Sequence, residues 1–105
     1  METTLVTHNG QFHADEVTAV AIYKIATTSP IKIIRTRDQA EIDKADVVID
    51  VGGIYDPSTD RYDHHQYKGG TAAAGMLWLN YGRLAIISMY EHLTVDQVQT
   101  AFEYV

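Results

Sequence analysis

Apolar and polar residues alternate along the first half of the chain in a pattern typical of α/β proteins. Apolar runs at residues 5–7, 31–35 and 46–51 predict three strands, and the continuous third run is typical of a strand buried on both faces. A helix is predicted between the first two strands by apolar residues at helical spacing, namely Ala14, Val17, Val20, Ala21 and Ile25. Residues 38–42 predict no more than one helical turn. This order of elements favours a parallel sheet with right-handed connections.

The second half of the chain has a different character. Residues 54–70 are polar and predict a long loop, and helices are predicted at 71–81, at 84–93 and from Val95 onward. Thr94 and Gln97 have the spacing of a capping box at the start of the last helix. That helix has apolar positions at Val95, Val98, Ala101, Phe102 and Val105, and it reaches the final residue without a glycine or proline stop.

These elements predict an α/β fold with three layers. We expect a mostly parallel sheet with helices on both faces, followed by a helical C-terminal part. A length of 105 residues is typical of one domain with a core of modest size. Because the last helix has no stop signal, we expect residues 1–105 to be a single domain that is cut within a helix.

Composition and charge restrict the function classes. Apolar residues at 46% and charged residues at 21% are ordinary for a soluble protein, and the absence of cysteine excludes disulfides and cysteine zinc sites. No apolar run approaches the roughly 18 residues of a membrane span, and the N-terminus lacks the basic start of a signal peptide. We therefore expect a cytoplasmic protein without membrane contact. A net charge of −6 argues against non-specific DNA binding but allows a small phosphorylated substrate or a short strand.

The residues that point to a specific chemistry are histidines and aspartates. Asp63, His64 and His65 are consecutive, and in an extended segment neighbouring side chains point in opposite directions. They would therefore serve a pair of metal centres, or one centre and its substrate. Taken alone, such a triplet is more typical of a solvated loop. The interpretation gains weight because His8, His13 and Asp15 follow the first predicted strand and Asp50 lies in the third, so that four of the five histidines belong to the set.

The predicted topology brings these groups together. Ligands of an open parallel sheet collect beyond the carboxyl ends of the strands, where His8 and Asp50 would lie. Such a cluster suits a two-metal centre, in which ions about 3.5–4 Å apart share a bridging carboxylate and assist phosphoester hydrolysis. Mixed histidine and carboxylate ligands favour Mn, Co or Fe over Ca.

Other residues have weaker signals. Arg35, Arg37 and Lys68 are candidate phosphate contacts, although each is more often a solvated charge. Gly52-Gly53 would let the backbone approach the metals or simply make a tight turn. Gly69-Gly70-Thr71 would hold a phosphate at a helix start or act as a flexible lead-in.

Five motifs, in order, resemble the melanocyte-proliferating-gene (Myg) branch of the DHH phosphoesterase superfamily. They lie within residues 4–82 and read Thr7-His-Asn-Gly-Gln-Phe-His-Ala-Asp-Glu16, Arg35-Thr-Arg-Asp38, Val47-Val-Ile-Asp-Val-Gly-Gly53, Tyr55-Asp-Pro57 and Arg61-Tyr-Asp-His-His-Gln66.

The resemblance implies a two-metal, usually Mn²⁺-dependent phosphoesterase, with Mg²⁺ or Co²⁺ as alternatives, and a 3′-to-5′ exonuclease action on RNA or a short oligonucleotide. By motif position, the implied roles cover seven residues. His8 and His13 would bind one metal and Asp15 the other, and Asp50 would bridge the two. Asp63 and His64 would complete the ligands of the two metals. His65 would face the phosphate, and Asp63 and His65 would be the catalytic residues.

The chain also departs from the family pattern. Family members are about three times longer, and they have a second domain and a further acidic motif to which nothing here corresponds. We therefore expect weak or no hydrolysis by this chain alone. Two function classes stay open: a metal-dependent phosphoesterase, and a catalytically incomplete metal-binding module that acts in interaction or regulation or as one piece of a split enzyme. Because the helices of residues 76–105 would leave apolar surface exposed, we also expect a homo-oligomer.

Overall fold

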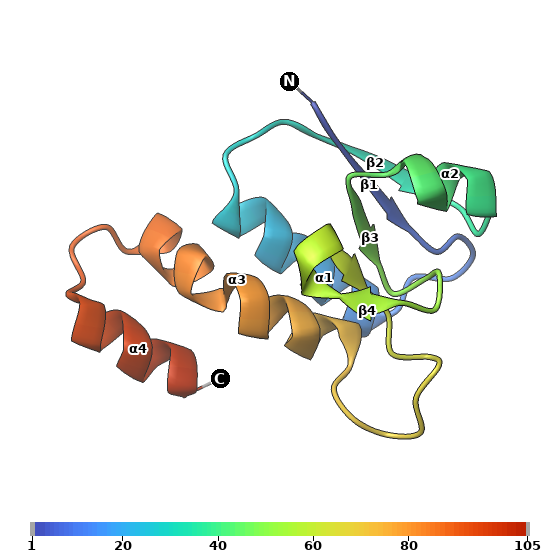
Figure 1. Cartoon of the computed structure of the whole chain (residues 1–105). Coiled ribbons are helices and arrows are strands. Elements are labelled where there is room, and N and C mark those ends of the chain that lie inside the picture. Colours follow the sequence, from blue (N-terminus) through green and yellow to red (C-terminus); the bar gives the residue numbers. More distant parts are fainter. Residues whose placement is uncertain (1, 105) are drawn as a thin grey trace.

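A computed structural model describes residues 2–104 and has a five-stranded sheet at its centre (Figure 1). The strand order is β2-β1-β3-β5-β4, and all pairs are parallel except β4 with β5. The strands are β1 (Thr3–Thr7), β2 (Ile31–Arg35), β3 (Val47–Ile49), β4 (Tyr55–Asp56) and β5 (Arg61–Tyr62). This confirms the expected α/β fold with a mostly parallel sheet.

Helices cover both faces of the sheet. The four α-helices are α1 (Ala14–Ala26), α2 (Gln39–Lys44), α3 (Ala73–Met89) and α4 (Val95–Glu103), and a short 3-10 helix spans Pro57–Thr59. Two core clusters show the layers, because successive strand residues point to opposite faces. Leu5 and Ile49 pack with residues of α1 and α3, whereas Val6 and Val48 pack with Ile42 of α2.

The buried face of α1 differs from the predicted one. Val17 and Ile25 are largely exposed, and the residues buried on α1 are Glu16, Ala19 and Tyr23. The spacing of apolar residues predicted the helix correctly. The face that it assigned to the core is rotated by about one residue from the face that is buried. Glu16 belongs to the buried stripe because its carboxylate accepts hydrogen bonds at the start of α1, a role that hydrophobicity does not reveal.

The predicted loop at 54–70 contains two strands, so that prediction was wrong. β5 adds to the sheet beside β3, with Val48 paired to Arg61 and Ile49 to Tyr62. The strands are only two residues long and contain polar residues, which hides their periodicity. As a consequence, Asp63 directly follows a parallel strand.

The predicted separation of two helices near residue 82 was also wrong, because α3 is continuous from Ala73 to Met89. Gly82 is buried, and a Cβ atom added there would come within 2.9 Å of the Phe102 ring of α4. The Trp78 and Phe102 rings stack beside it with centroids 5.6 Å apart. Gly82 therefore permits close packing of α4 on α3 and does not end a helix.

The last helix begins as expected. Thr94 and Gln97 form the capping box at its start, and Val98 is its buried residue. Val95 is exposed, so it does not belong to the packed stripe. Val105 lies outside the described residues. Within residues 2–104, no helix combines the length and the apolar character needed to cross a bilayer.

Candidate functional site

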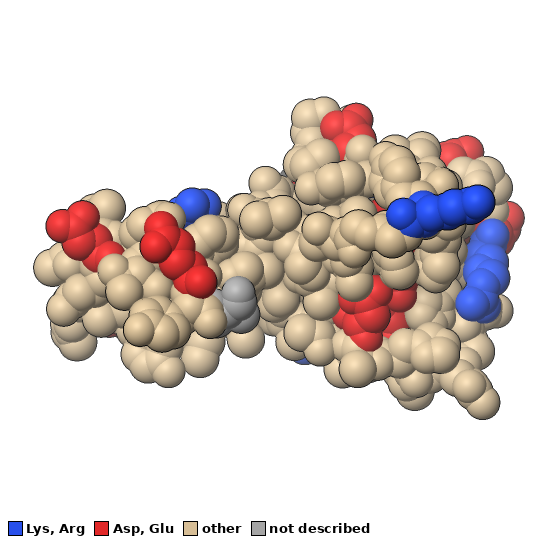
Figure 2. All heavy atoms as spheres, turned by 90° about the horizontal axis from the view of Figure 1, so that it is seen from below, with Lys and Arg blue, Asp and Glu red and all other residues tan. Residues whose placement is uncertain are grey.

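A cavity of about 720 Å³ opens at the carboxyl ends of β1, β3 and β5, beside the start of α1. Figure 2 shows acidic side chains gathered in a hollow on the face seen from below. The cavity is lined by His8, His13, Asp15, Arg37, Asp50, Val51, Gly52, Gly53, Asp63, His64, His65 and Gln66. All seven predicted metal and catalytic residues are thus brought to one place. Arg37 joins them, and Lys68 does not belong to the lining.

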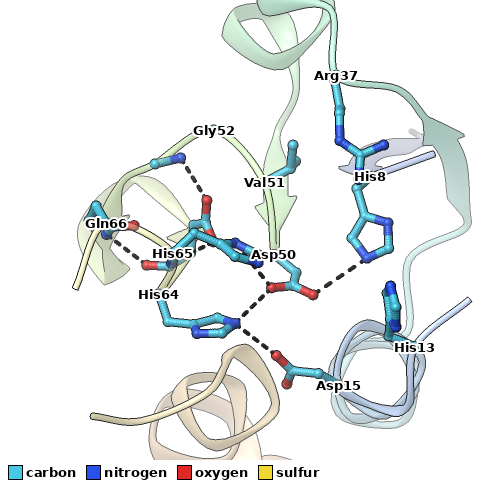
Figure 3. A pocket seen from close by; sticks show the side chains of 12 residues that line it. His8, His13, Asp15, Arg37, Asp50, Val51, Gly52, His64, His65 and Gln66 are labelled. Carbon is cyan, nitrogen blue, oxygen red and sulfur yellow. Dashed lines mark hydrogen bonds and ion pairs between the residues drawn. The ribbon is translucent and has the colours of Figure 1, made fainter. Parts of the chain in front are cut away.

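Asp50 lies at the centre of this cavity, directly after β3 (Figure 3). Its Oδ2 atom is 3.5 Å from Nε2 of His8, and its Oδ1 atom is 3.0 Å from Nε2 of His64. Oδ1 is buried and has no partner in hydrogen-bond geometry. The two oxygens of one carboxylate therefore face two different groups of histidines.

The surroundings of Asp50 are unfavourable to a lone carboxylate. Burial raises the pKa of Asp50 and the nearby charge of Asp15 raises it further, against the opposing effect of His65, His64 and His8. The backbone of Asp50 has a φ of 61°, in the left-handed region that non-glycine residues seldom adopt. Its amide donates to the carbonyl of Tyr62 at 2.7 Å, which ties this turn to β5.

Asp63 is held from several sides. Its Oδ2 atom accepts from the Gly53 amide at 2.7 Å, and its Oδ1 atom accepts from the His65 amide at 3.2 Å and lies 2.5 Å from Nδ1 of His65. Burial would raise the pKa of Asp63, but the hydrogen bonds from Gly53 and His65 outweigh it and hold that pKa below its usual range. Gly53, with a φ of 74°, brings its backbone to a carboxylate of the cavity.

His64 and His65 lie side by side although they are neighbours in sequence. Their rings stack with centroids 4.5 Å apart, and Nδ1 of His65 lies 3.7 Å from Oδ1 of Asp50. The backbone has left the extended form after β5, so the expectation that adjacent side chains point in opposite directions does not hold here.

The upstream histidines form the other side of the cavity. His8 is buried, with Nδ1 3.0 Å from the carbonyl oxygen of Asn9 and Nε2 3.7 Å from Oε1 of Glu16. The exposed His13 is the N-cap residue of α1, and its ring centroid lies 5.4 Å from that of His8. This pair reaches Asp50 from the side opposite His64.

Asp15 and Glu16 show what the sequence did not reveal. Both oxygens of Asp15 accept from backbone amides at the start of α3, from Ala74 at 2.7 Å and Ala73 at 3.2 Å. Its Oδ2 atom is also 3.1 Å from Nε2 of His64. The buried Glu16 accepts from the His13 amide. The capping-box spacing of residues 13 and 16 could have suggested Glu16, whereas the bond from Asp15 to α3 depends on tertiary packing.

Four of these residues could hold a metal ion. Asp50, Asp63, His64 and His65 each place one ligand atom within 4.8 Å of the others. The group contains His65, which the family resemblance assigned to the phosphate. His8, His13 and Asp15 lie around this group and not within it.

Comparisons with known proteins show what the chain is similar to. Residues 4–105 match the family model MYG1_exonuc, described as Uncharacterised protein family (UPF0160). The chain is similar to the MYG1 exonuclease of Mus musculus, with 37% identity over 108 residues that cover 88% of this chain and 28% of the mouse protein.

Two further relatives show the same pattern. The MYG1 exonuclease of Homo sapiens is 37% identical over 92 residues, covering 72% of this chain and 24% of the human protein. The MYG1 protein of Chlamydia pneumoniae is 49% identical over 74 residues, covering 68% of this chain and 26% of its own length. The chain therefore spans about a quarter of the length of the curated relatives that it matches. No solved structure matches the chain significantly.

Proposed function

The chain belongs to the MYG1_exonuc family, and on this premise we propose that it is a metal-dependent phosphoesterase domain that hydrolyses RNA or oligonucleotide ends. The family match confirms the resemblance drawn from the five sequence motifs. Relatives named MYG1 exonuclease support a nuclease activity. A 3′-to-5′ direction of hydrolysis is part of the same proposal.

One observation carries the proposal more than any other: Asp50 presents its two oxygens to two separate groups of histidines. Its Oδ1 atom is buried and has no partner in hydrogen-bond geometry, although Nε2 of His64 lies 3.0 Å away, and a bound cation would compensate its charge. A carboxylate in this position suits the bridge between two metal ions.

The donors around Asp50 suggest how two ions would be held. His8 and His13 would bind one ion, and Asp63, His64 and Asp15 would bind the other, with Asp50 shared between them. Mixed nitrogen and oxygen donors favour Mn²⁺, with Mg²⁺ or Co²⁺ as alternatives. Such ions, when bound, lower the pKa of a water molecule and neutralise charge on the phosphate.

The remaining side chains of the cavity would position the substrate. Asp63 fixes the His65 ring through Nδ1, so that Nε2 of His65 would be free to donate to a phosphate oxygen. Arg37 lines the cavity, and its guanidinium bonds to the carbonyl oxygen of Asn9 at 2.8 Å, which would direct its other N–H groups toward an anion.

Weak turnover of this chain alone is part of the proposal. Both oxygens of Asp15 accept hydrogen bonds from the start of α3, and both oxygens of Asp63 are bonded to Gly53 and His65. Each carboxylate would therefore share its lone pairs between these donors and a metal ion. A net charge of −6 repels phosphates at long range. The same bonds of Asp15 favour the second candidate, a metal-binding module without turnover that acts in regulation or as one piece of a split enzyme.

The test is cleavage of a short RNA labelled at its 5′ end, with and without Mn²⁺. We expect slow, Mn²⁺-dependent shortening from the 3′ end, lost in Asp63→Asn and kept in Asp96→Asn, which makes the same charge change on α4. Absence of cleavage at protein concentrations above that of the RNA would contradict a phosphoesterase and favour the second candidate. Fast turnover would contradict the proposal that the site is weakened.

A further inference from the structure

An aromatic ring stands exposed beside the metal-binding cavity. Phe12 belongs to the segment between His8 and His13, and 70% of its surface is accessible. The next residue in the chain, His13, lines the cavity. Phe12 is not itself part of the lining, but its backbone adjoins that of a lining residue.

Phe12 is held in place by a cation. The guanidinium carbon of Arg35, at the end of β2, lies 3.8 Å from the centroid of the Phe12 ring. Nη2 of Arg35 also donates to the carbonyl oxygen of Gly10 at 3.0 Å, which fixes the loop over the arginine. A cation–π contact of this kind covers one face of the ring. With 70% of the residue accessible, the opposite face of the ring is open.

A second guanidinium binds the same loop. Arg37 is two residues beyond Arg35, lines the cavity and bonds to Asn9. The segment between His8 and His13 is therefore held by two arginines, one of which faces the cavity. This part of the surface thus combines a fixed aromatic surface with positive charge, in a protein that is otherwise acidic.

We propose that the open face of Phe12 is a stacking surface for a nucleobase of single-stranded nucleic acid. This subsite rests on the proposed function, because it places a base next to the phosphate that the cavity would bind. Aromatic side chains beside a positively charged path are the general means of binding single strands without sequence preference. The Arg35 guanidinium contributes by holding the ring at a fixed angle.

The experiment compares two probes that differ only in their bases. One is a fluorescein-labelled five-nucleotide oligoadenylate, and the other is the same backbone with abasic residues; both carry phosphorothioate linkages to slow hydrolysis. Affinities are measured by fluorescence anisotropy at low salt with Mn²⁺, for the wild-type chain, Phe12→Leu, Phe12→Tyr and Tyr104→Leu. Tyr104 is the matched control because it is an exposed aromatic residue directly after α4, 88% accessible.

We expect the wild-type chain to bind the base-bearing probe at least about tenfold more tightly than the abasic probe, since stacking of one base is worth on the order of 1.4 kcal/mol. Phe12→Leu should lose this preference, while Phe12→Tyr and Tyr104→Leu should keep it. The subsite is overturned by equal affinity of the wild-type chain for both probes, by absence of binding to either, or by an unchanged preference in Phe12→Leu.

Hydrolysis of a base-free phosphodiester by the same variants separates the subsite from the proposed function. The wild-type chain should hydrolyse this substrate in the presence of Mn²⁺, and the control variant Tyr104→Leu should do so at the same rate. If no variant hydrolyses it while the base preference is present and depends on Phe12, the proposed function fails and the stacking subsite stands. If hydrolysis is present without any base preference, the subsite fails alone.

Discussion

Asp50 combines several unfavourable features in one residue: a buried carboxylate, a left-handed backbone and an oxygen with no partner in hydrogen-bond geometry. Such features occur together at functional sites more often than elsewhere. Burial raises the pKa of Asp50, so the metal-free fold is penalised when this carboxylate ionises. Its contribution to stability is present below the ordinary carboxyl pKa and is lost as the pH rises through the raised pKa.

Replacement of Asp50 therefore has opposite consequences for the metal-free and metal-bound states. Asp50→Asn removes the buried charge, and asparagine tolerates a left-handed backbone, so we expect its melting temperature at neutral pH without metal to equal or exceed that of the wild type. Mn²⁺ should raise the melting temperature of the wild type and raise that of Asp50→Asn much less. The measurement is thermal unfolding with and without Mn²⁺.

Asp96→Asn is the control, since it changes the formal charge equally at an exposed position of α4. Its response to Mn²⁺ should match that of the wild type. An equal rise in Asp50→Asn would show that the stabilising ion is bound elsewhere.

The residues of the site were accessible to sequence reasoning to different degrees. His8 and Asp50 follow predicted strands, and the topology rule alone places them at one edge of the sheet. The hydrogen bonds of Asp15 to Ala73 and Ala74 join positions 58 and 59 residues apart, and no local pattern encodes them. No sequence signal marks Phe12, because its exposure and its contact with Arg35 depend on tertiary structure.

For individual helices and strands, prediction and structure agree where the local sequence pattern and the tertiary packing favour the same element. The strand at 31–35 and the capped start of α4 were predicted at their observed positions, since both have strong local signals. β4 and β5 were missed because two-residue strands have no measurable period. The predicted gap between helices at 71–81 and 84–93 contains Gly82, whose lack of a side chain serves the contact with Phe102.

Gly82 gives a prediction at this scale. Alanine stabilises an exposed helix by about 1 kcal/mol over glycine. At position 82, however, the added Cβ atom would meet the rings of Trp78 and Phe102 at 2.7 and 2.9 Å. We expect Gly82→Ala to lower the free energy of unfolding by roughly 1–3 kcal/mol, as overpacking does, measured by urea denaturation.

A double variant provides the control. A Phe102→Leu background removes the clash with Phe102 and leaves the one with Trp78, so the same substitution should cost less than in the wild type. A stabilising effect of Gly82→Ala in the wild-type background would refute the close packing of α4 on α3.

At the scale of the whole molecule, the two ends of the structure differ in surface character. The sheet end has the polar cavity, whereas α3 and α4 extend away from it (Figure 1). An apolar groove of about 440 Å³ lies between these helices, lined by Trp78, Ile86, Met89, Tyr90, Leu93 and Ala101. Exposed apolar surface of this kind favours association.

We therefore propose that the chain self-associates through the groove between α3 and α4. Sedimentation at micromolar concentration should show a species of at least twice 11.7 kDa. Tyr90→Asp should shift the population toward the monomer, because it places a charge in the contact. Val17→Asp should not, although Val17 is also an exposed apolar residue, because it lies on α1. A wild-type chain that sediments only as the monomer would contradict this proposal.

If Asp50 is shared by two metal ions, as we propose, the chain should bind two ions, and these can be counted. Titration with Mn²⁺, followed by the paramagnetic resonance signal of the free ion, gives the number bound per chain. We predict two bound ions for the wild type and Asp96→Asn, and at most one of comparable affinity for Asp50→Asn. Saturation at one ion in the wild type, no saturable binding, or two ions retained in Asp50→Asn would contradict the account.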